Sequence, residues 1–180
     1  MLKEGSLPQS TDGDPYQPIQ IRVYDTSIEL HYGTRYFINS TELNDATHFA
    51  VAHALAGRGI LPVIFTRESR ENATNKYPQN AKIYYFSNYI KTKDTISPLS
   101  IKYIEWLVEA EREKFFLLID CIDYLRIYNE MQNLLMFVEE LFDIVARKKA
   151  ILIIPVYLPA FEQQEVHLLE RFGETISLKA

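Results

Sequence analysis

The sequence has little cysteine, no excess of positive charge and no long hydrophobic run. Its single cysteine, Cys121, cannot form a disulfide within the chain, so cysteine usage gives no sign of secretion. The formal net charge of -5 argues against a general nucleic-acid-binding surface, because such surfaces are usually basic. The longest apolar stretch, residues 150–161, contains prolines and is too short to span a bilayer. We therefore expect a cytoplasmic protein with no membrane span and no nucleic-acid partner.

The N-terminal segment offers little for a core. Residues 1–17 are rich in Ser, Pro, Gly, Asp and Gln, and have no apolar stretch of the length that a signal peptide needs. They predict a mobile N-terminal tail. The rest of the chain, residues 18–180, has the size of one domain, and a hydrophobic share of 47% with 24% charged residues is typical of a globular protein. We expect a single domain there.

Short apolar runs alternate with helical stretches from about residue 34 onward. The apolar runs predict strands at 35–39, 60–66, 81–87, 115–120, 150–156 and 174–178. The helical patterns predict a helix over 42–56 capped by Ser40 or Thr41, a turn or short helix over 67–77, a helix over 99–113 opened by Ser97 and Pro98, and helices over 128–147 and 158–173. Residues 18–33 predict a hairpin or an edge strand.

This alternation predicts a doubly wound α/β fold. Strands separated by helices form a mainly parallel central sheet with helices on both faces, a three-layer α/β/α arrangement. The runs "FFLLI" (115–119) and "ILIIPV" (151–156) are apolar throughout, as central parallel strands with two covered faces must be.

Two acidic residues follow the most apolar of these strands. Asp120 ends the strand predicted at 115–120, and Asp123 lies three positions further on. In P-loop hydrolases an aspartate in this position holds Mg²⁺, and ligands of parallel sheets bind at this edge. An aspartate at a strand end also caps a turn or the next helix. We favour the capping interpretation and keep metal binding as the alternative.

The segment where a phosphate loop should lie lacks the residues for one. A phosphate cradle needs glycines, whose backbone N–H groups close around the phosphate, and a lysine followed by Ser or Thr. Residues 37–49, "FINSTELNDATHF", contain neither glycine nor lysine, and the Gly-x-x-x-x-Gly-Lys spacing occurs nowhere in the chain. The sequence therefore argues against ordinary P-loop hydrolysis.

Several segments resemble the archaeal family called domain of unknown function 835. They are "YFIN", "VAHALAGRGILPVIFTRES", "SPLSIKYIEWL", "FFLLIDCIDYLRIYNEMQNLLMFVEEL" and "IIPVYLPAFEQQEVHLLERF", within residues 34–174 or so. In "LLIDCIDYLRIYN" the family pattern is matched by Asp120, Asp123, Tyr124, Leu125 and Asn129, while Cys121 stands where the family usually has glycine. The resemblance implies a degenerate RecA/KaiC-like fold without its phosphate loop, in a family whose members are often attached to signalling or membrane modules.

Arg67 follows the strand predicted at 60–66, at the same sheet edge as Asp120. It is a candidate for anion binding, although we favour a solvated turn in which Arg67 pairs with an acid such as Asp120 or Glu68. "TRES" (66–69) also resembles the strand end of KaiC-like folds where an acid helps to activate water, which makes Glu68 and Asp120 the catalytic candidates. The candidate ligand-binding residues are Arg67, Asp120, Asp123 and Asn129.

Other kinds of site lack their residues. A response-regulator receiver needs an acidic pair after its first strand and a lysine after its last main strand, and the chain has neither. His48 and His53 are five positions apart, whereas one metal on a helix face requires a spacing of four. We therefore expect His53 to be a hydrogen-bonded core residue. Neither a cysteine cluster nor a Gly-x-Ser-x-Gly elbow is present, so we expect no metal site and no cofactor.

Aromatic residues make up 13% of the chain and gather in residues 82–90 and 101–107. Because Tyr and Trp are enriched at protein interfaces, the candidate interface residues are Tyr84, Tyr85, Tyr89, Tyr103 and Trp106. The alternative is that these rings fill the core. The sequence indicates a non-catalytic protein-binding or scaffold module for signalling, acting on a protein partner or on a second copy of itself. The alternative function is an atypical nucleotide-binding ATPase that uses Asp120 and Glu68 without a standard phosphate loop.

Overall fold

The computed structural model describes residues 14–112, 114–171 and 173–178. Most of the tail predicted at 1–17 therefore lies outside the described residues. The chain begins with a hairpin of β1 (Ile19–Val23) and β2 (Thr26–Leu30), which forms a separate two-stranded antiparallel sheet. The sequence predicted either a hairpin or an edge strand for residues 18–33, and the structure forms the hairpin. It packs on the helix that follows the first strand of the main sheet.

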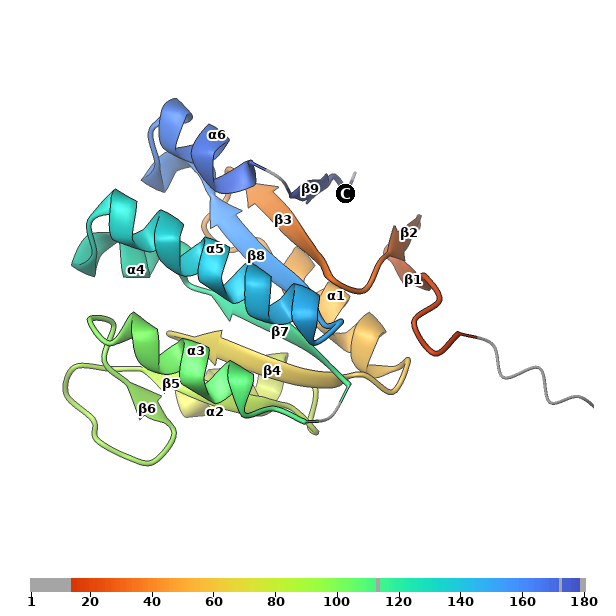
Figure 1. Ribbon diagram of the computed structural model, residues 1–180, viewed down its shortest axis with the longest axis horizontal. Helices are drawn as coiled ribbons and strands as arrows, with labels where there is room; N and C mark the ends of the chain where they lie inside the picture. Colours follow the sequence, from red (N-terminus) through yellow and green to blue (C-terminus); the bar gives the residue numbers. More distant parts are fainter. Residues whose placement is uncertain (1–13, 113, 172, 179–180) are drawn as a thin grey trace, which may run out of the picture.

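A seven-stranded parallel sheet forms the centre of the domain (Figure 1). Its strands are β3 (Thr34–Ser40), β4 (Leu61–Thr66), β5 (Lys82–Phe86), β6 (Thr95–Ile96), β7 (Phe115–Asp120), β8 (Ile151–Tyr157) and β9 (Glu174–Ile176). The strand order is β6-β5-β4-β7-β8-β3-β9. The helices are α1 (Thr47–Ala56), α2 (Arg70–Lys76), α3 (Ile101–Glu109), α4 (Ile122–Tyr128), α5 (Met131–Arg147) and α6 (Gln163–Glu170), with a 3₁₀ turn η1 (Leu158–Ala160) before α6. The predicted three-layer α/β/α fold is confirmed.

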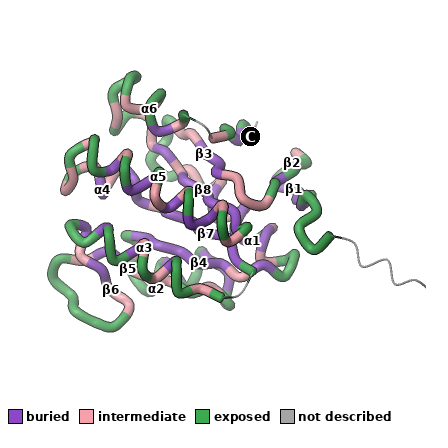
Figure 2. Tube along the Cα trace, viewed as in Figure 1, coloured by how far each residue is buried: buried purple, intermediate pink, exposed green. Residues whose placement is uncertain are grey.

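Two apolar layers, one on each face of the sheet, explain why β7 is apolar throughout. Phe115, Leu117 and Ile119 point into the layer beneath α3, α4 and α5, whereas Phe116 and Leu118 point into the layer beneath α1 and α2. This alternation is the geometry of a strand buried on both faces. Figure 2 shows the buried residues concentrated along the central strands and on the helix sides that face them.

Three helix boundaries differ from the sequence prediction. The helix predicted over 42–56 begins only at Thr47, and the Ser40 hydroxyl accepts a bond from Glu42 N–H in a loop instead of capping the helix. The helix predicted over 128–147 begins at Met131 as α5, and a separate helix that the sequence did not predict, α4, precedes it and ends at Tyr128 because the chain is extended at Asn129. The last helix begins at Gln163 in a capping box, and Pro159 belongs to the 3₁₀ turn before it. In each case a side-chain bond or a local turn overrides the apolar periodicity.

The connections place a crevice at the carboxyl edge of the sheet. After β3 and β4 the chain passes to α1 and α2 on one face, whereas after β7 and β8 it passes to α4 and η1–α6, whose buried residues lie in the layer on the other face. Because β7 lies beside β4 and β8 lies beside β3, neighbouring strands send their loops to opposite sides. Loops that diverge in this way leave a crevice, where parallel sheets bind ligands.

Arg35 links strand β3 to the helices that pack beside it. Its guanidinium is fully buried, lies 2.9 Å from Glu139 of α5, donates to the carbonyl of Arg171 and rests on the ring of Phe142. A buried charge requires such partners. This one side chain therefore joins β3, α5 and the end of the α6 segment.

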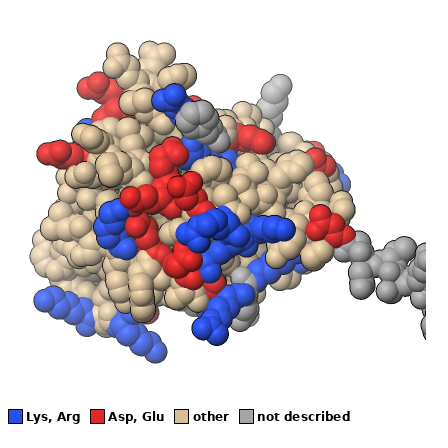
Figure 3. Space-filling view, in the orientation of Figure 1, with Lys and Arg blue, Asp and Glu red and all other residues tan. Residues whose placement is uncertain are grey.

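Charged side chains gather over α3 and α5 on the face seen in Figure 3. Lys102 lies 3.3 Å from Glu105 and also pairs with Glu140. Burial, together with the neighbouring Glu140, raises the pKa of Glu105 to about 7, and Lys102 opposes this rise only in part.

No helix in the described residues is long and apolar enough to cross a membrane.

We predict that Glu105→Gln makes the fold less sensitive to pH. Between the ordinary glutamate pKa of 4.5 and about 7, folded Glu105 holds a proton that the unfolded chain releases. The free energy of unfolding of the wild type should therefore fall as pH rises through this window. The glutamine variant does not titrate and lacks this loss. Its free energy of unfolding relative to that of the wild type should therefore rise by on the order of 1 kcal/mol between pH 4.5 and pH 8. This is less than the full pKa shift implies, because the carboxyl is partly solvated.

Urea unfolding at a series of pH values measures this difference, and Glu71→Gln, at an exposed position on α2, is the control. Parallel pH profiles for the wild type and Glu105→Gln would contradict the prediction.

Candidate functional site

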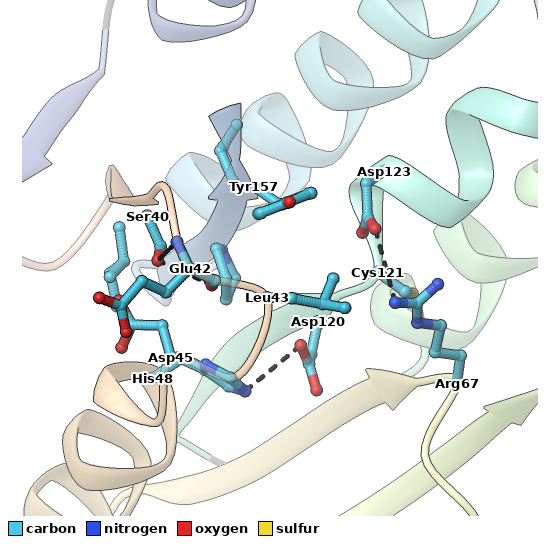
Figure 4. A pocket seen from close by; sticks show the side chains of 13 residues that line it. Ser40, Glu42, Leu43, Asp45, His48, Arg67, Asp120, Cys121, Asp123 and Tyr157 are labelled. Atoms are coloured by element: carbon cyan, nitrogen blue, oxygen red, sulfur yellow. Dashed lines mark hydrogen bonds and ion pairs between the residues drawn. The ribbon is translucent and has the colours of Figure 1, made fainter. Parts of the chain in front are cut away.

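A cleft lies at the carboxyl ends of β3, β4, β7 and β8, where the connections diverge (Figure 4). Its wall carries the last residues of three strands, Ser40, Asp120 and Tyr157, and Arg67, which follows β4. The loop between β3 and α1 closes one side with Leu43. A second depression, which shares Leu43, Arg67 and Asp120 with the first, continues toward α2.

Asp120 is held by groups from three other parts of the chain. One carboxylate oxygen, Oδ2, accepts a hydrogen bond from Thr66 Oγ1 at the end of β4, 3.1 Å away, and another from the hydroxyl of Tyr77, just after α2. The other oxygen, Oδ1, lies 3.3 Å from Nε2 of His48 on α1. Helix α4 has no side-chain cap. The capping role favoured from the sequence is therefore wrong, because Asp120 binds distant elements instead of its own turn.

The surroundings of Asp120 keep its neighbours protonated. Burial and the charge of Asp120 raise the pKa of Tyr77 far above its ordinary value, so that its hydroxyl remains a donor. Burial and the charges of Asp120 and Asp123 likewise raise the pKa of Cys121. The Cys121 thiol donates to the carbonyl of Phe65 at 3.7 Å. The backbone φ of Cys121 is 180°, which is extended and open to any residue. Cys121, which stands where the family pattern has glycine, is therefore accommodated without strain.

A carboxylate occupies the N-terminus of α1. Asp45 Oδ1 accepts a hydrogen bond of 2.8 Å from the first helical N–H, that of Thr47. Burial opposes ionisation of Asp45, but bonds from Thr47 and Ser40 and the charge of His48 outweigh it and lower the pKa. The N-terminus of a helix carries a partial positive charge and is where phosphate binds in nucleotide-binding loops. Here the chain places its own anion there.

The ligand-binding candidates are only partly brought together. Arg67, Asp120 and Asp123 line the same cleft. Arg67 pairs with Asp123, at 3.7 Å, and not with Asp120 or Glu68 as expected. Asn129 lies apart, because its side-chain amide donates to the carbonyls of Pro98 and Leu125 at the end of α4.

The two catalytic candidates line the same depression but have different partners. Glu68 lines the second depression together with Asp120, and its carboxylate pairs with Lys76 at 2.7 Å. In the described parts of the chain no three or more His, Cys, Asp or Glu side chains are arranged to hold a metal ion. His53 is exposed, not a core residue as expected, although its Nε2 lies 2.9 Å from the carbonyl of Lys76.

The interface candidates divide between the two faces of the sheet. Tyr84 stacks on Phe65 in the layer beneath α3, whereas Tyr85 faces the opposite layer and carries the guanidinium of Arg70 over its ring. Both are half-buried. The remaining candidates are exposed, Tyr89 in the loop after β5 and Tyr103 and Trp106 on α3.

Four residues of the site were missed by sequence reasoning: Asp45, His48, Thr66 and Tyr77. Thr66 lies opposite Asp120 in the register of β4 and β7, and as the last residue of the strand predicted at 60–66 it could have been found beside Arg67. Asp45 sits just before α1, where an acidic residue is typical. Neither His48 nor Tyr77 has a comparable signal, because tertiary packing alone brings them to Asp120.

The fold and the cleft define an α/β protein with a parallel sheet and a candidate ligand site at its carboxyl edge. A family model described as "Protein of unknown function (DUF835)" matches residues 42–172. The match spans most of the chain, and the chain belongs to this family, as the sequence motifs indicated. No curated protein matches the chain.

We predict that Asp120→Ala destabilises the fold more than Asp120→Asn does. Alanine leaves the buried Tyr77 hydroxyl and Thr66 hydroxyl without an acceptor, which costs about 1–3 kcal/mol, whereas asparagine keeps one side-chain oxygen. Thermal or urea unfolding of the two variants measures the difference. Asp123→Ala is the matched control, because this carboxylate has only the loose pair with Arg67. An Asp120→Ala variant as stable as the wild type would refute this role.

Proposed function

We propose that the chain is a non-catalytic protein-binding module. The observation that carries the proposal is a pair of exposed aromatic rings on α3. Tyr103 and Trp106 stack with ring centroids 5.6 Å apart and 14° between their planes, and they are 46% and 62% exposed. Exposed Trp and Tyr side chains hold much of the binding energy at the centres of protein interfaces.

Charged side chains border the aromatic pair. The neighbouring side of α3 carries Lys102 and Glu105, which lie beside Glu140 of α5 and give the aromatic surface a charged border. An apolar centre with a polar border is the usual arrangement of a protein interface.

The sheet edge supports a non-catalytic function. Asp120 accepts hydrogen bonds from Thr66 and Tyr77 and lies 3.3 Å from His48. Asp45 accepts a bond from the first N–H of α1, and Glu68 is paired with Lys76. The alternative, an ATPase that uses Asp120 and Glu68, would have to bind phosphate or metal in competition with these contacts.

We further propose that the module is a degenerate RecA/KaiC-like domain acting in signalling in the cytoplasm of an archaeal cell, through self-association or a protein partner. The family resemblance, the glycine-free segment before α1 and the parallel sheet support this. Side-by-side assembly is common among RecA-type folds, which favours a second copy as one partner.

We predict that truncating Trp106 abolishes association. Light scattering over a range of concentrations measures self-association, and pull-down from native extract measures binding of a partner. Trp106→Ala and Tyr103→Ala should weaken the contact by roughly 2 kcal/mol or more. The control is Leu168→Ala, an exposed apolar residue on α6.

A strictly monomeric wild type, with partners bound equally by wild type and Trp106→Ala, would refute the proposal. Phosphate release from ATP that disappears in Asp120→Ala would instead support the ATPase alternative.

A further inference from the structure

An arginine and an aspartate in the cleft have unused hydrogen-bonding groups. Nη2 of Arg67 lies 3.7 Å from Oδ2 of Asp123, which is too far for a hydrogen bond. Within the described residues neither side chain makes another hydrogen bond. By contrast, Nζ of the neighbouring Lys76 donates a hydrogen bond of 2.7 Å to Oε1 of Glu68. Arg67 and Asp123 thus present a separated positive and negative charge, both with capacity to bind a further group.

Apolar side chains flank this pair. A depression of about 560 Å³ is lined by Arg67 and Asp123 together with Leu43, Ile127 and Tyr157. Leu43 and Ile127 are 66% and 75% exposed, although both are large and apolar. Figure 4 shows Leu43 lying across the cleft between Tyr157 and Asp120. The volume lies within the usual range for small-ligand sites.

The charges around the depression restrict what it can bind. A second arginine, Arg126, also lines the depression, but its guanidinium bonds Glu165 at 2.8 Å. Besides Asp123, the adjoining cleft contains Glu42, Asp45 and Asp120, so acidic residues outnumber basic ones and disfavour a multiply charged phosphate. Asp45 and Asp120 are already hydrogen-bonded within the protein. A matching ligand therefore carries one anionic group for the arginine and one cationic group for the aspartate, close together, with an apolar part beside them.

We propose that this depression binds a free α-amino acid with an apolar side chain. The ligand carboxylate pairs with the guanidinium of Arg67, a geometry that arginine favours. The ligand ammonium pairs with Asp123. The side chain covers Leu43 and Ile127, whose exposed apolar surface is then removed from water. This ligand site does not depend on the proposed protein interface, because it uses none of the aromatic residues of α3.

Isothermal titration calorimetry of the full chain with L-leucine tests the ligand class. We expect saturable binding with a Kd below about 1 mM. N-acetyl-L-leucine, which lacks the cationic group, and L-leucinamide, which lacks the anionic one, should bind about tenfold or more weakly, since each loses a charge-assisted contact. Equal binding of N-acetyl-L-leucine would overturn the proposal in favour of the C-terminus of a peptide. Tighter binding of inorganic phosphate, or no binding of leucine up to about 10 mM, would also overturn it.

Variants locate the site. Arg67→Gln and Asp123→Asn should each weaken leucine binding by about tenfold or more, while circular dichroism confirms that both fold. Arg67→Lys keeps the charge but not the two-pronged donor, and should fall between wild type and Arg67→Gln. The matched control is Arg22→Gln, because Arg22 forms a similarly loose pair with Asp25, 4.0 Å apart, in the β1–β2 turn. Unchanged affinity in Arg67→Gln and Asp123→Asn would place the amino acid elsewhere and refute the assignment.

Discussion

The carboxylate of Asp120 joins elements that the sheet alone would leave independent. Thr66 reaches it along the neighbouring strand, while His48 and Tyr77 reach it from α1 and from the end of α2, the two helices of one face. A partly buried carboxylate needs donors, and the buried hydroxyls of Thr66 and Tyr77 need an acceptor, so each group satisfies the other. The imidazole of His48 lies 3.3 Å from the carboxylate but forms no hydrogen bond within the described residues. Apolar packing holds α1 and α2 against β7, and the bonds to Asp120 fix the polar floor of the cleft.

Local signals in the sequence were enough for the layers of the fold but not for the partners of individual side chains. The run from Phe115 to Ile119 identified a strand covered on both faces, and strand ends correctly placed Arg67 and Asp120 at one edge. The start of α1 and the whole of α4 were missed. A side-chain bond competes with apolar periodicity at the start of α1, and the seven residues of α4 are too few to show a clear helical period. The partner of Arg67 was also missed. Three acids were possible partners of Arg67, because each is near it in sequence or at the same sheet edge: Asp120, Glu68 and Asp123. Only the path of the chain into α4 brings Asp123 to the guanidinium of Arg67.

The cleft and the aromatic surface occupy different parts of the molecule but share one short connection. Asp123 lies in the first turn of α4, and Asn129 at its end donates to the carbonyl of Pro98, which precedes α3. Helix α4 therefore spans the distance between the charged pair of the cleft and the segment that introduces Tyr103 and Trp106. The end of α4 is bonded to the segment before α3, whereas its first turn carries the loose pair of Asp123 with Arg67.

Asp45 alters how the stability of the domain responds to its surroundings. A protein whose helix N-terminus is completed by a bound phosphate gains stability in proportion to the logarithm of ligand concentration, and loses it when the ligand is scarce. Here the anion is covalently part of the chain, so its effective concentration at α1 never changes. The stability that this contact adds is therefore independent of the concentration of any ligand, because the carboxylate cannot diffuse away.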